Sequence, residues 1–292
     1  MLIGHTMAVP EFNLVDAFSV FKIIGLEGIE IASMRPDEIN IRFSSRPGGI
    51  PAIFRDPVWP GMTGDSKKGL RDVADRSDVP IITITPYVKA FNYYPDRAAA
   101  DSAREELIRY VALAKELGAR YVRVYGGREV DDYAAGFDLA IESLKRIASL
   151  AEQHGVTLLI ENHPGTLTVT GTQTARLIAS VGSPNVRALY DPANVIMHSI
   201  EDWQTTIDVQ SDIISYVHVK DFRSDATGKK TACVVGDGVV PWREIIEKLK
   251  TLGPLPPLSL EYERLWYPDN LPPAPDGLAS SLRFLSPLIV GG

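Results

Sequence analysis

Short apolar runs alternate with longer amphipathic runs along the whole chain. Eight short runs are rich in β-branched or aromatic residues, and most are too uniformly apolar for half-exposed strands, which predicts buried parallel strands. These predicted strands are residues 2–9, 28–33, 80–88, 120–126, 156–163, 185–191, 214–221 and 257–263. The longer runs show helical periodicity, and several stop at a glycine, the usual C-terminal end of a helix. The predicted helices are residues 14–24, 67–76, 96–117, 132–154, 172–181, 200–210, 242–252 and 277–288.

The alternation of strands and helices predicts an α/β fold. Eight strand–helix units in 292 residues give about 36 residues per unit, the rhythm of a (β/α)₈ TIM barrel. A doubly wound sheet is the alternative, because alternation alone does not separate the two folds. The first strand-to-helix turn, "AVPEFN", lacks a glycine-rich dinucleotide-binding motif, which weakens that alternative. We therefore predict a single TIM-barrel domain over residues 1–292.

Two segments are longer than this rhythm requires. We expect an extended loop at residues 34–65, after the second strand, and a Pro-rich loop at residues 264–276, after the eighth. The first loop carries four arginines and the second carries Trp266 and Tyr267. Because both follow strands, both belong on the catalytic face of a barrel. Long loops there are often lids, and an oligomer contact is an equal alternative.

Composition and charge narrow the cellular context. A formal net charge of -7 argues against a nucleic-acid partner, which usually meets a basic patch. The single cysteine, Cys233, excludes an internal disulfide and fits a reducing compartment. No apolar run approaches the ~18 residues that would suggest a membrane span, and the first residues lack the basic region of a signal peptide. We expect a cytoplasmic protein without a membrane partner.

Four successive predicted strands end in residues that bind metals. The stretch "VTLLIENHPG" runs from buried strand into Glu161, and the next three strands end near Asp191, His218 and Glu261. Each alone is ordinary, because strand-end carboxylates are often solvated and a strand histidine is often a hydrogen-bonded core residue. Three carboxylates at one barrel mouth, however, would repel one another unless a cation neutralises them. Three oxygens and one imidazole predict one divalent metal ion, with Mn²⁺ favoured over Mg²⁺, Co²⁺ or Zn²⁺.

The motifs around these residues resemble a known family. "IENH", "DPAN", "HVKD" and "LSLEYE", with "GDGVVPWREIIEKL" before the last, are similar to the sugar phosphate isomerase/epimerase superfamily of xylose isomerase-like TIM barrels. That superfamily includes tagatose and psicose 3-epimerases, hydroxypyruvate isomerase, inosose dehydratase and endonuclease IV. The resemblance is closest from about residue 80 to residue 290. It is specific for the superfamily rather than for one member.

The resemblance implies a mechanism. Glu161, Asp191, His218 and Glu261 would ligate one metal ion, and the two glutamates would also move the substrate proton. A metal chelated by a ketone and its neighbouring hydroxyl acidifies the C–H between them through an enediolate. One glutamate would remove that proton and the other would return it on the opposite face or at the adjacent carbon. Because a metal-bound carboxylate is a poor base, we expect partial burial to raise its pKa.

Four further residues are candidates for binding the substrate. His163 lies two positions beyond the first glutamate on the same strand face, although it could equally cap the loop. Asn194 stands where several sugar epimerases have a substrate-contacting histidine. Lys220 and Arg223 offer positive charge beside the metal, for an alkoxide, carboxylate or phosphate. The alternative for Lys220 is a salt bridge with Asp221.

These residues favour a metal-dependent isomerase or epimerase of carbohydrate metabolism that acts on a small sugar or keto-sugar. The alternative is a lyase of the same fold that dehydrates a keto-inositol or cleaves a 3-keto-glycoside. Such a lyase needs a group that protonates the leaving oxygen, and His163 and Lys220 are the candidates. The superfamily also suggests a homodimer or homotetramer.

Two other functions are less compatible with the sequence. An endonuclease IV-like repair enzyme assembles three zinc ions from many histidines, and this chain has five histidines and a negative net charge. A noncatalytic subunit of the same fold should lose at least one metal ligand, and here all four are present.

Overall fold

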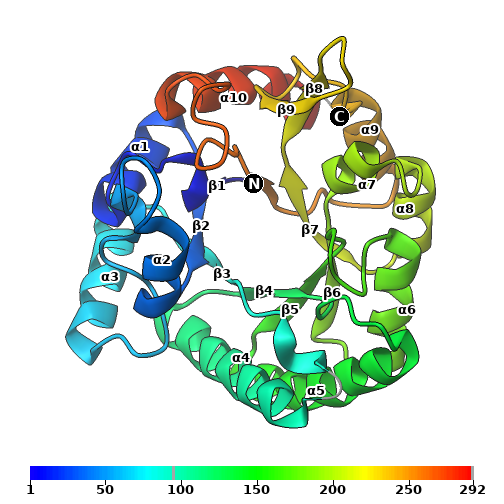
Figure 1. The fold of residues 1–292 in the computed structure, drawn as a ribbon. Coiled ribbons are helices and arrows are strands. Elements are labelled where there is room, and N and C mark those ends of the chain that lie inside the picture. Colours follow the sequence, from blue (N-terminus) through cyan, green and yellow to red (C-terminus); the bar gives the residue numbers. More distant parts are fainter. Residues whose placement is uncertain (94–95, 291–292) are drawn as a thin grey trace.

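The structure is a computed structural model, and it describes residues 1–93 and 96–290. Eight parallel strands close into a barrel in the order β1-β10-β7-β6-β5-β4-β3-β2, and helices surround it (Figure 1). The strands are β1 (Leu2–His5), β2 (Gly28–Ser33), β3 (Ile81–Pro86), β4 (Tyr121–Tyr125), β5 (Thr157–Glu161), β6 (Val186–Tyr190), β7 (Ile214–Val219) and β10 (Leu258–Leu260). The TIM barrel is therefore confirmed, and the open doubly wound sheet is excluded.

The helices lie close to the predicted ranges. They are α1 (Leu14–Ile24), α2 (Pro36–Phe43), α3 (Gly64–Ser77), α4 (Arg97–Leu117), α5 (Tyr133–His154), α6 (Gly171–Val181), α7 (Pro192–His198), α8 (Trp203–Gln210), α9 (Trp242–Thr251) and α10 (Ala274–Val290). The side chains of Asp96 and Asp132 cap the first turns of α4 and α5. Gly118 ends α4 with a φ of 77°, a left-handed conformation that favours glycine.

Several elements lie where no helix or strand is predicted. The segment 34–65 contains α2 and a short 3₁₀ helix, η2 (Ala52–Phe54), and α7 follows β6 directly. Both α2 and α7 begin with a proline and are too short for clear periodicity. The predicted strand 214–221 stops at Val219, and an antiparallel hairpin follows, made of β8 (Asp221–Ser224) and β9 (Lys230–Cys233).

The barrel interior has an apolar layer beneath a polar one. The apolar layer is a separate buried cluster made of Ile3, Ile82, Tyr121, Leu159, Leu189 and Tyr216. Inward-facing positions alternate along each strand, so the next inward residues of β4, β5 and β7 are Arg123, Glu161 and His218. The strands thus place charged side chains at the end of the barrel where active sites of this fold lie.

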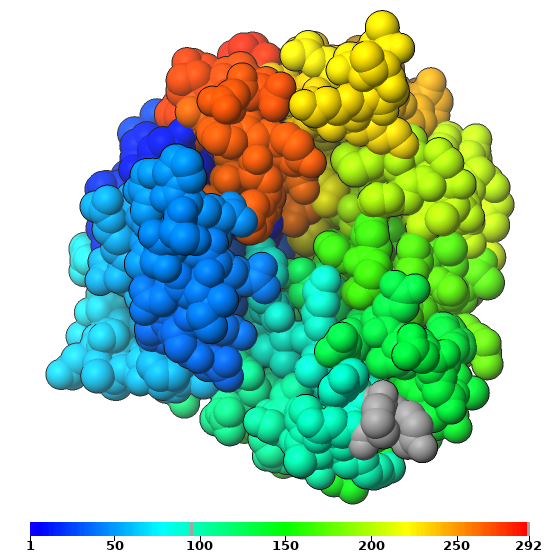
Figure 2. Space-filling view, in the orientation of Figure 1, coloured from blue at the N-terminus to red at the C-terminus, as the bar shows by residue number. Residues whose placement is uncertain are grey.

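The two long segments meet at the barrel mouth. Figure 2 shows residues of the 34–65 segment, in blue, close to the orange segment that follows β10. The ring of Phe43, at the end of α2, stacks against Trp266 with centroids 6.0 Å apart. The guanidinium of Arg46 lies 4.9 Å from the centroids of both rings. Both segments therefore lie on the catalytic face, as predicted from their positions after strands.

Two other short elements shape the loops. The 3₁₀ helix η1 (Thr6–Ala8) follows β1, and η3 (Ala90–Asn92) follows β3. Among the helices of residues 1–93 and 96–290, none is long and apolar enough to cross a membrane.

Candidate metal centre and active site

Four strand ends bring the predicted metal-binding residues together. Glu161 is the last residue of β5, and Asp191 directly follows β6, where its side chain caps α7. His218 lies within β7, and Glu261 directly follows β10. All four are buried, and one possible ligand atom from each lies within 4.8 Å of the others. The geometry therefore brings three carboxylates and one imidazole to one point.

The imidazole of His218 is oriented from behind. Its Nε2 lies 3.0 Å from Oε1 of Glu30, a fully buried carboxylate of β2. Its Nδ1 faces the cluster, 3.5 Å from Oε1 of Glu161 and 3.4 Å from Oε2 of Glu261. A histidine that donates one ring N–H to a carboxylate presents its other nitrogen as a metal ligand. Glu30 therefore fixes which nitrogen faces the cluster.

The donor set fits a divalent cation. Nδ1 of His218 is buried and makes no hydrogen bond within the described parts of the chain, whereas Oδ2 of Asp191 pairs with the Lys220 ammonium. Buried polar atoms are rarely left without a partner, so atoms that point to a shared centre indicate a ligand. Three carboxylates with one imidazole suit Mn²⁺, Mg²⁺ or Co²⁺, and Zn²⁺ also accepts such ligands.

Lys220 inserts its ammonium group between two of these carboxylates. Its Nζ lies 2.9 Å from Oδ2 of Asp191 and 2.8 Å from Oε2 of Glu261, and 3.6 Å from Glu263. Burial alone would lower the pKa of Lys220, but these carboxylates raise it well above its ordinary value. The alternative partner, Asp221, instead accepts backbone N–H groups of the loop after β9.

The carboxylates titrate over a wide range. Burial raises the pKa of Asp191 to about 6 against the opposing effect of Lys220. Burial also acts to raise the pKa of Glu161, but the Arg123 guanidinium and other positive neighbours lower it to about 2. The pKa of Glu261 is lowered well below its ordinary value, because Lys220 and His218 outweigh burial. The two glutamates are therefore ionised, and their pKa values are lowered where burial was expected to raise them.

The cluster opens into a cavity of about 230 Å³. This volume is below the roughly 300–1,000 Å³ of pockets that hold drug-sized ligands, so it suits one small ring or a short chain. The two long segments contribute Arg42 and Trp266 to its wall. The lining residues are Met7, Arg42, Tyr87, Lys89, Arg123, Tyr125, Glu161, His163, Lys220, Glu261, Glu263 and Trp266.

Three of the four predicted substrate-binding residues lie at this site. His163 lines the cavity with its ring edge against Tyr125, at a centroid distance of 4.8 Å, and burial lowers its pKa to about 4. Lys220 also lines it. Asn194 is buried in the first turn of α7, and its Nδ2 lies 3.5 Å from Oε1 of Glu161 and 3.1 Å from the Asn162 carbonyl. It therefore contacts the carboxylate and does not line the cavity.

The structure does not bring Arg223 to the others. Arg223 lies on β8 opposite Thr231, is exposed, and is not part of the cavity wall. The hairpin turns the chain outward immediately after Lys220. Residue spacing along "HVKDFR" does not reveal this change of direction, because it suggests a strand that continues through residue 221.

Sequence reasoning missed two buried charges of the site, Glu30 and Arg123. Each stands in an otherwise apolar strand, "GIEIAS" and "RYVRVYG", and that interruption is the available signal. The carboxylate of Glu30 also accepts hydrogen bonds from Thr85 and Tyr216, at 2.5 and 2.9 Å. Nη1 of Arg123 lies 3.5 Å from Oε2 of Glu161.

A family assignment follows from sequence. The sequence model described as xylose isomerase-like TIM barrel matches residues 22–288. The chain belongs to this family. The inosose dehydratase of Geobacillus thermodenitrificans is 28% identical over 131 residues, an alignment that covers 40% of this chain and 44% of that protein. The match thus spans less than half of the curated relative, so its activity is not transferred with it.

Solved structures of this family share the whole fold. The chain is similar to the IOLI protein with a binding zinc atom at a TM-score of 0.75 and 16% identity, which covers 99% of this chain and 98% of that one. It is also similar to a D-tagatose 3-epimerase-like protein at a TM-score of 0.74 and 17% identity, which covers 99% and 96%. At these identities the likeness concerns the fold alone. A dehydratase thus stands among its sequence relatives, and an epimerase-like protein among the structures that share its fold.

Proposed function

We propose that this protein is a divalent-metal-dependent isomerase or epimerase of a small sugar or keto-sugar. The observation that carries the proposal is the convergence of Glu161, Asp191, His218 and Glu261 within 4.8 Å, beside a small cavity that the two glutamates line. These four residues would hold the ion, and Mn²⁺ is our preferred choice because oxygen ligands predominate. The zinc atom bound in the IOLI structure supports a metal ion in this fold, although not the identity of the metal here.

The two glutamates would perform the proton transfer. A bound divalent cation would supply stabilisation of the negative charge that develops on a ketone oxygen. Glu161 and Glu261 come from β5 and from the end of β10, and both line the cavity. Their carboxylates lie 3.5 and 3.4 Å from Nδ1 of His218, so both are close to the same point beside the cavity. One would take the proton beside the ketone and the other would return it.

The low basicity of Glu161 restricts which substrate protons it can remove. With a pKa of about 2, the carboxylate is a weak base, so it removes only a strongly acidified proton. The buried site helps because the negative charge that develops on the substrate interacts more strongly with nearby positive groups there than in water. His163, whose lowered pKa keeps its ring neutral above about pH 4, can hydrogen-bond a substrate hydroxyl without adding charge.

A lyase is the second candidate, and Lys220 favours it. Its ammonium group lines the cavity between Asp191 and Glu261, where it could protonate a leaving hydroxyl after the first proton is removed. The curated relative named inosose dehydratase supports the same chemistry. Both candidates share the first half-reaction.

One experiment tests the first step and separates the two candidates. The purified protein is loaded with Mn²⁺ and incubated in heavy water with a panel of ketoses, inososes and 3-keto-glycosides. We expect deuterium in one class of substrate and a loss of about 10²-fold or more in Glu161→Gln. Glu247→Gln, an exposed glutamate on α9, is the matched control. A rearranged ketose supports the isomerase, whereas the loss of water or an aglycone supports the lyase. Absence of metal binding and of exchange across the panel would overturn the proposal.

A further inference from the structure

Three cations besides Lys220 form part of the cavity wall. Arg42 comes from α2, Lys89 precedes η3, and Arg123 lies in β4. Of these three, only Arg123 has a carboxylate within 4.0 Å in the described parts of the chain, namely Glu161 at 3.5 Å. Arg42 lies over the ring of Tyr87 and Lys89 over the ring of Tyr125, at 5.5 and 4.2 Å from the centroids. Two cations therefore face the cavity with aromatic rather than acidic partners.

Arg123 has hydrogen-bond donors without acceptors. Its side chain is 2% exposed, and Nε and Nη1 have no hydrogen-bond partner among the described residues. A buried donor without a partner costs free energy, and the cost is larger when the donor is charged. The guanidinium carbon lies 3.9 Å from the centroid of the Tyr125 ring. An acceptor brought by a ligand would satisfy these donors.

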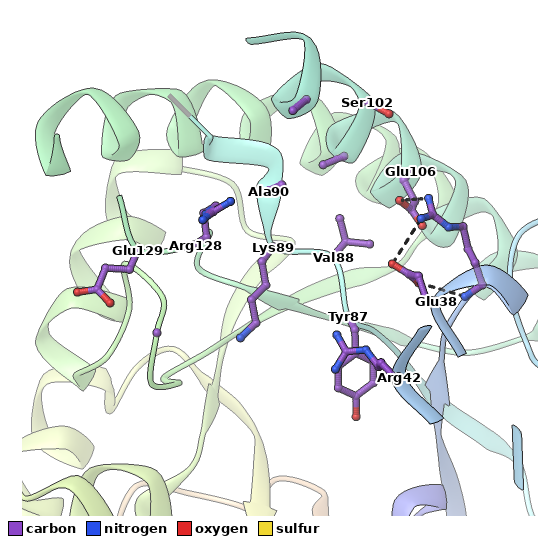
Figure 3. Close-up of a pocket in the computed structure, with 14 residues that line it drawn as sticks. Glu38, Arg42, Tyr87, Val88, Lys89, Ala90, Ser102, Glu106, Arg128 and Glu129 are labelled. Atoms are coloured by element: carbon purple, nitrogen blue, oxygen red, sulfur yellow. Dashed lines mark hydrogen bonds and ion pairs between the residues drawn. The ribbon is translucent and has the colours of Figure 1, made fainter. Parts of the chain in front are cut away.

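A second cavity adjoins this wall. It has a volume of about 750 Å³ and shares Arg42, Tyr87 and Lys89 with the smaller cavity (Figure 3). Arg128, exposed and without a carboxylate within 4.0 Å among the described residues, adds a further positive charge. The same residues thus separate the small cavity from a larger, open space.

The acidic residues of the larger cavity do not cancel these charges. Oε2 of Glu106 and Oε1 of Glu38 pair with Arg35, at 3.0 and 3.6 Å. Glu129 points away from Lys89 in Figure 3. The positive charge next to the shared wall is therefore left for a ligand.

We propose that this wall binds an anionic group of the substrate, a carboxylate or a phosphate, through Arg42, Lys89 and Arg123. The inference rests on the proposed function, because it places the ketone end of the same molecule at Glu161 and Glu261. An arginine matches two oxygens of either anion, and a lysine adds a point charge. The larger cavity then holds whatever part of the substrate extends beyond its anionic group.

The test compares ketoses that differ in one group. Mn²⁺-loaded protein is titrated calorimetrically with D-fructose, D-fructuronate and D-fructose 6-phosphate. We expect one anionic ketose to bind at least about tenfold more tightly than D-fructose, because hydrogen bonds between charged groups are stronger than those between neutral groups. Whether the carboxylate or the phosphate gains the affinity identifies the group.

Variants assign the effect to the wall. Arg42→Gln and Lys89→Gln should each reduce the preference for the anionic ketose by about tenfold. Arg76→Gln on α3 and Lys145→Gln on α5 remove the same charges from exposed positions outside both cavities and should keep the preference. Equal affinity for all three ketoses, or a preference that survives in both wall variants, would overturn the inference.

A second titration separates this inference from the proposed function. Chelator-treated protein is titrated with inorganic phosphate and with acetate, so that neither metal nor turnover is needed. Binding of one anion that Arg42→Gln and Lys89→Gln weaken supports the anion site even if no substrate exchanges deuterium. Deuterium exchange without any anion binding or anionic preference supports the proposed function and rejects the anion site.

Discussion

Oε1 of Glu30 lies 3.0 Å from Nε2 of His218, and the pair joins β2 to β7 across the barrel interior. Burial alone would raise the pKa of Glu30, but His218 and His5 lower it, so the carboxylate is ionised. Its second partner, His5, lies 3.5 Å away with Nε2 and donates no hydrogen bond from that atom within the described residues. Glu30 thus orients one imidazole and holds its proton on the nitrogen remote from the carboxylate cluster.

This arrangement predicts that Glu30→Gln weakens metal binding. The amide removes a negative charge and leaves the orientation of His218 less fixed, so Mn²⁺ affinity should fall by roughly 10–100-fold. The measurement is a Mn²⁺ titration followed by electron paramagnetic resonance, with circular dichroism to verify folding. Glu105→Gln, an exposed position on α4, is the control and should bind as the wild type does. Unchanged affinity in Glu30→Gln would show that His218 needs no such support.

Lys220 has the opposite effect on a divalent cation. Its ammonium group lies within 2.9 Å of oxygens of Asp191 and Glu261, so it neutralises them but also repels a second cation. Lys220→Gln should therefore raise Mn²⁺ affinity while catalysis by either proposed route falls. Calorimetric titration of metal into both proteins is the measurement, and weaker metal binding in the variant would contradict the interpretation.

The same substitution should also lower the stability of the metal-free protein. In the presence of a chelator, Lys220→Gln leaves buried carboxylates without their ion-pair partner, which typically costs about 3–5 kcal/mol. We expect the free energy of unfolding in urea to fall by roughly that amount, and Mn²⁺ to restore most of it. Lys145→Gln, which removes an exposed cation on α5, serves as the control.

The lowered pKa of His163 predicts that the stability of the folded chain depends on pH. Burial lowers its pKa to about 4 in the folded chain, against 6.5 in the unfolded chain. As the pH falls through 6.5, the unfolded chain binds a proton that the folded chain does not, so stability is lost between pH 6.5 and 4. Chelator-treated wild type should lose about 2–3 kcal/mol more than His163→Gln between pH 7.5 and 4.5, measured by urea unfolding. Parallel losses in the two proteins would contradict this.

Cys233 should be unreactive in the folded protein. The thiol is 6% exposed, and burial with the nearby Asp221 raises its pKa from 9.0 to about 12. At pH 8 the thiolate, the reactive form, is then roughly 1000-fold scarcer than in an unperturbed thiol. Ellman's reagent should label the native protein at least that much more slowly than the protein in urea. Rapid labelling of the native protein would show that β9 opens readily.

The local pattern predicted the barrel well, because each buried strand is read from its own residues. The strand 28–33 has the predicted bounds, and the helices ending at Gly118 and Gly155 stop where predicted. The proximity of Asp191 and Glu261 could be predicted, because strand ends are visible in the sequence and a barrel brings successive strand ends to one rim.

What the pattern could not reveal depends on side-chain partners. In the sequence, Arg123 is only a charged residue in an otherwise apolar strand. Its contact with Glu161 and its place in the cavity wall are visible only in the structure. Lys220 pairs with Asp191 and Glu261, which are 29 and 41 positions away in sequence, and sequence proximity favoured Asp221. The turn after Lys220 likewise depends on backbone N–H groups that bind Asp221 from the loop 236–240.

Asp191 uses its two oxygens for different tasks. Oδ1 accepts the backbone N–H of Asn194 at the start of α7, and Oδ2 faces the carboxylate cluster. The hydrogen bond to α7 therefore fixes the orientation of the carboxylate, because rotation of the Asp191 side chain would remove the N-terminal cap of the helix. A glutamate at this position would keep the charge but add a methylene, which moves the second oxygen past the cluster or breaks the cap. The length of one side chain thus restricts this position to aspartate, a demand that charge alone does not impose.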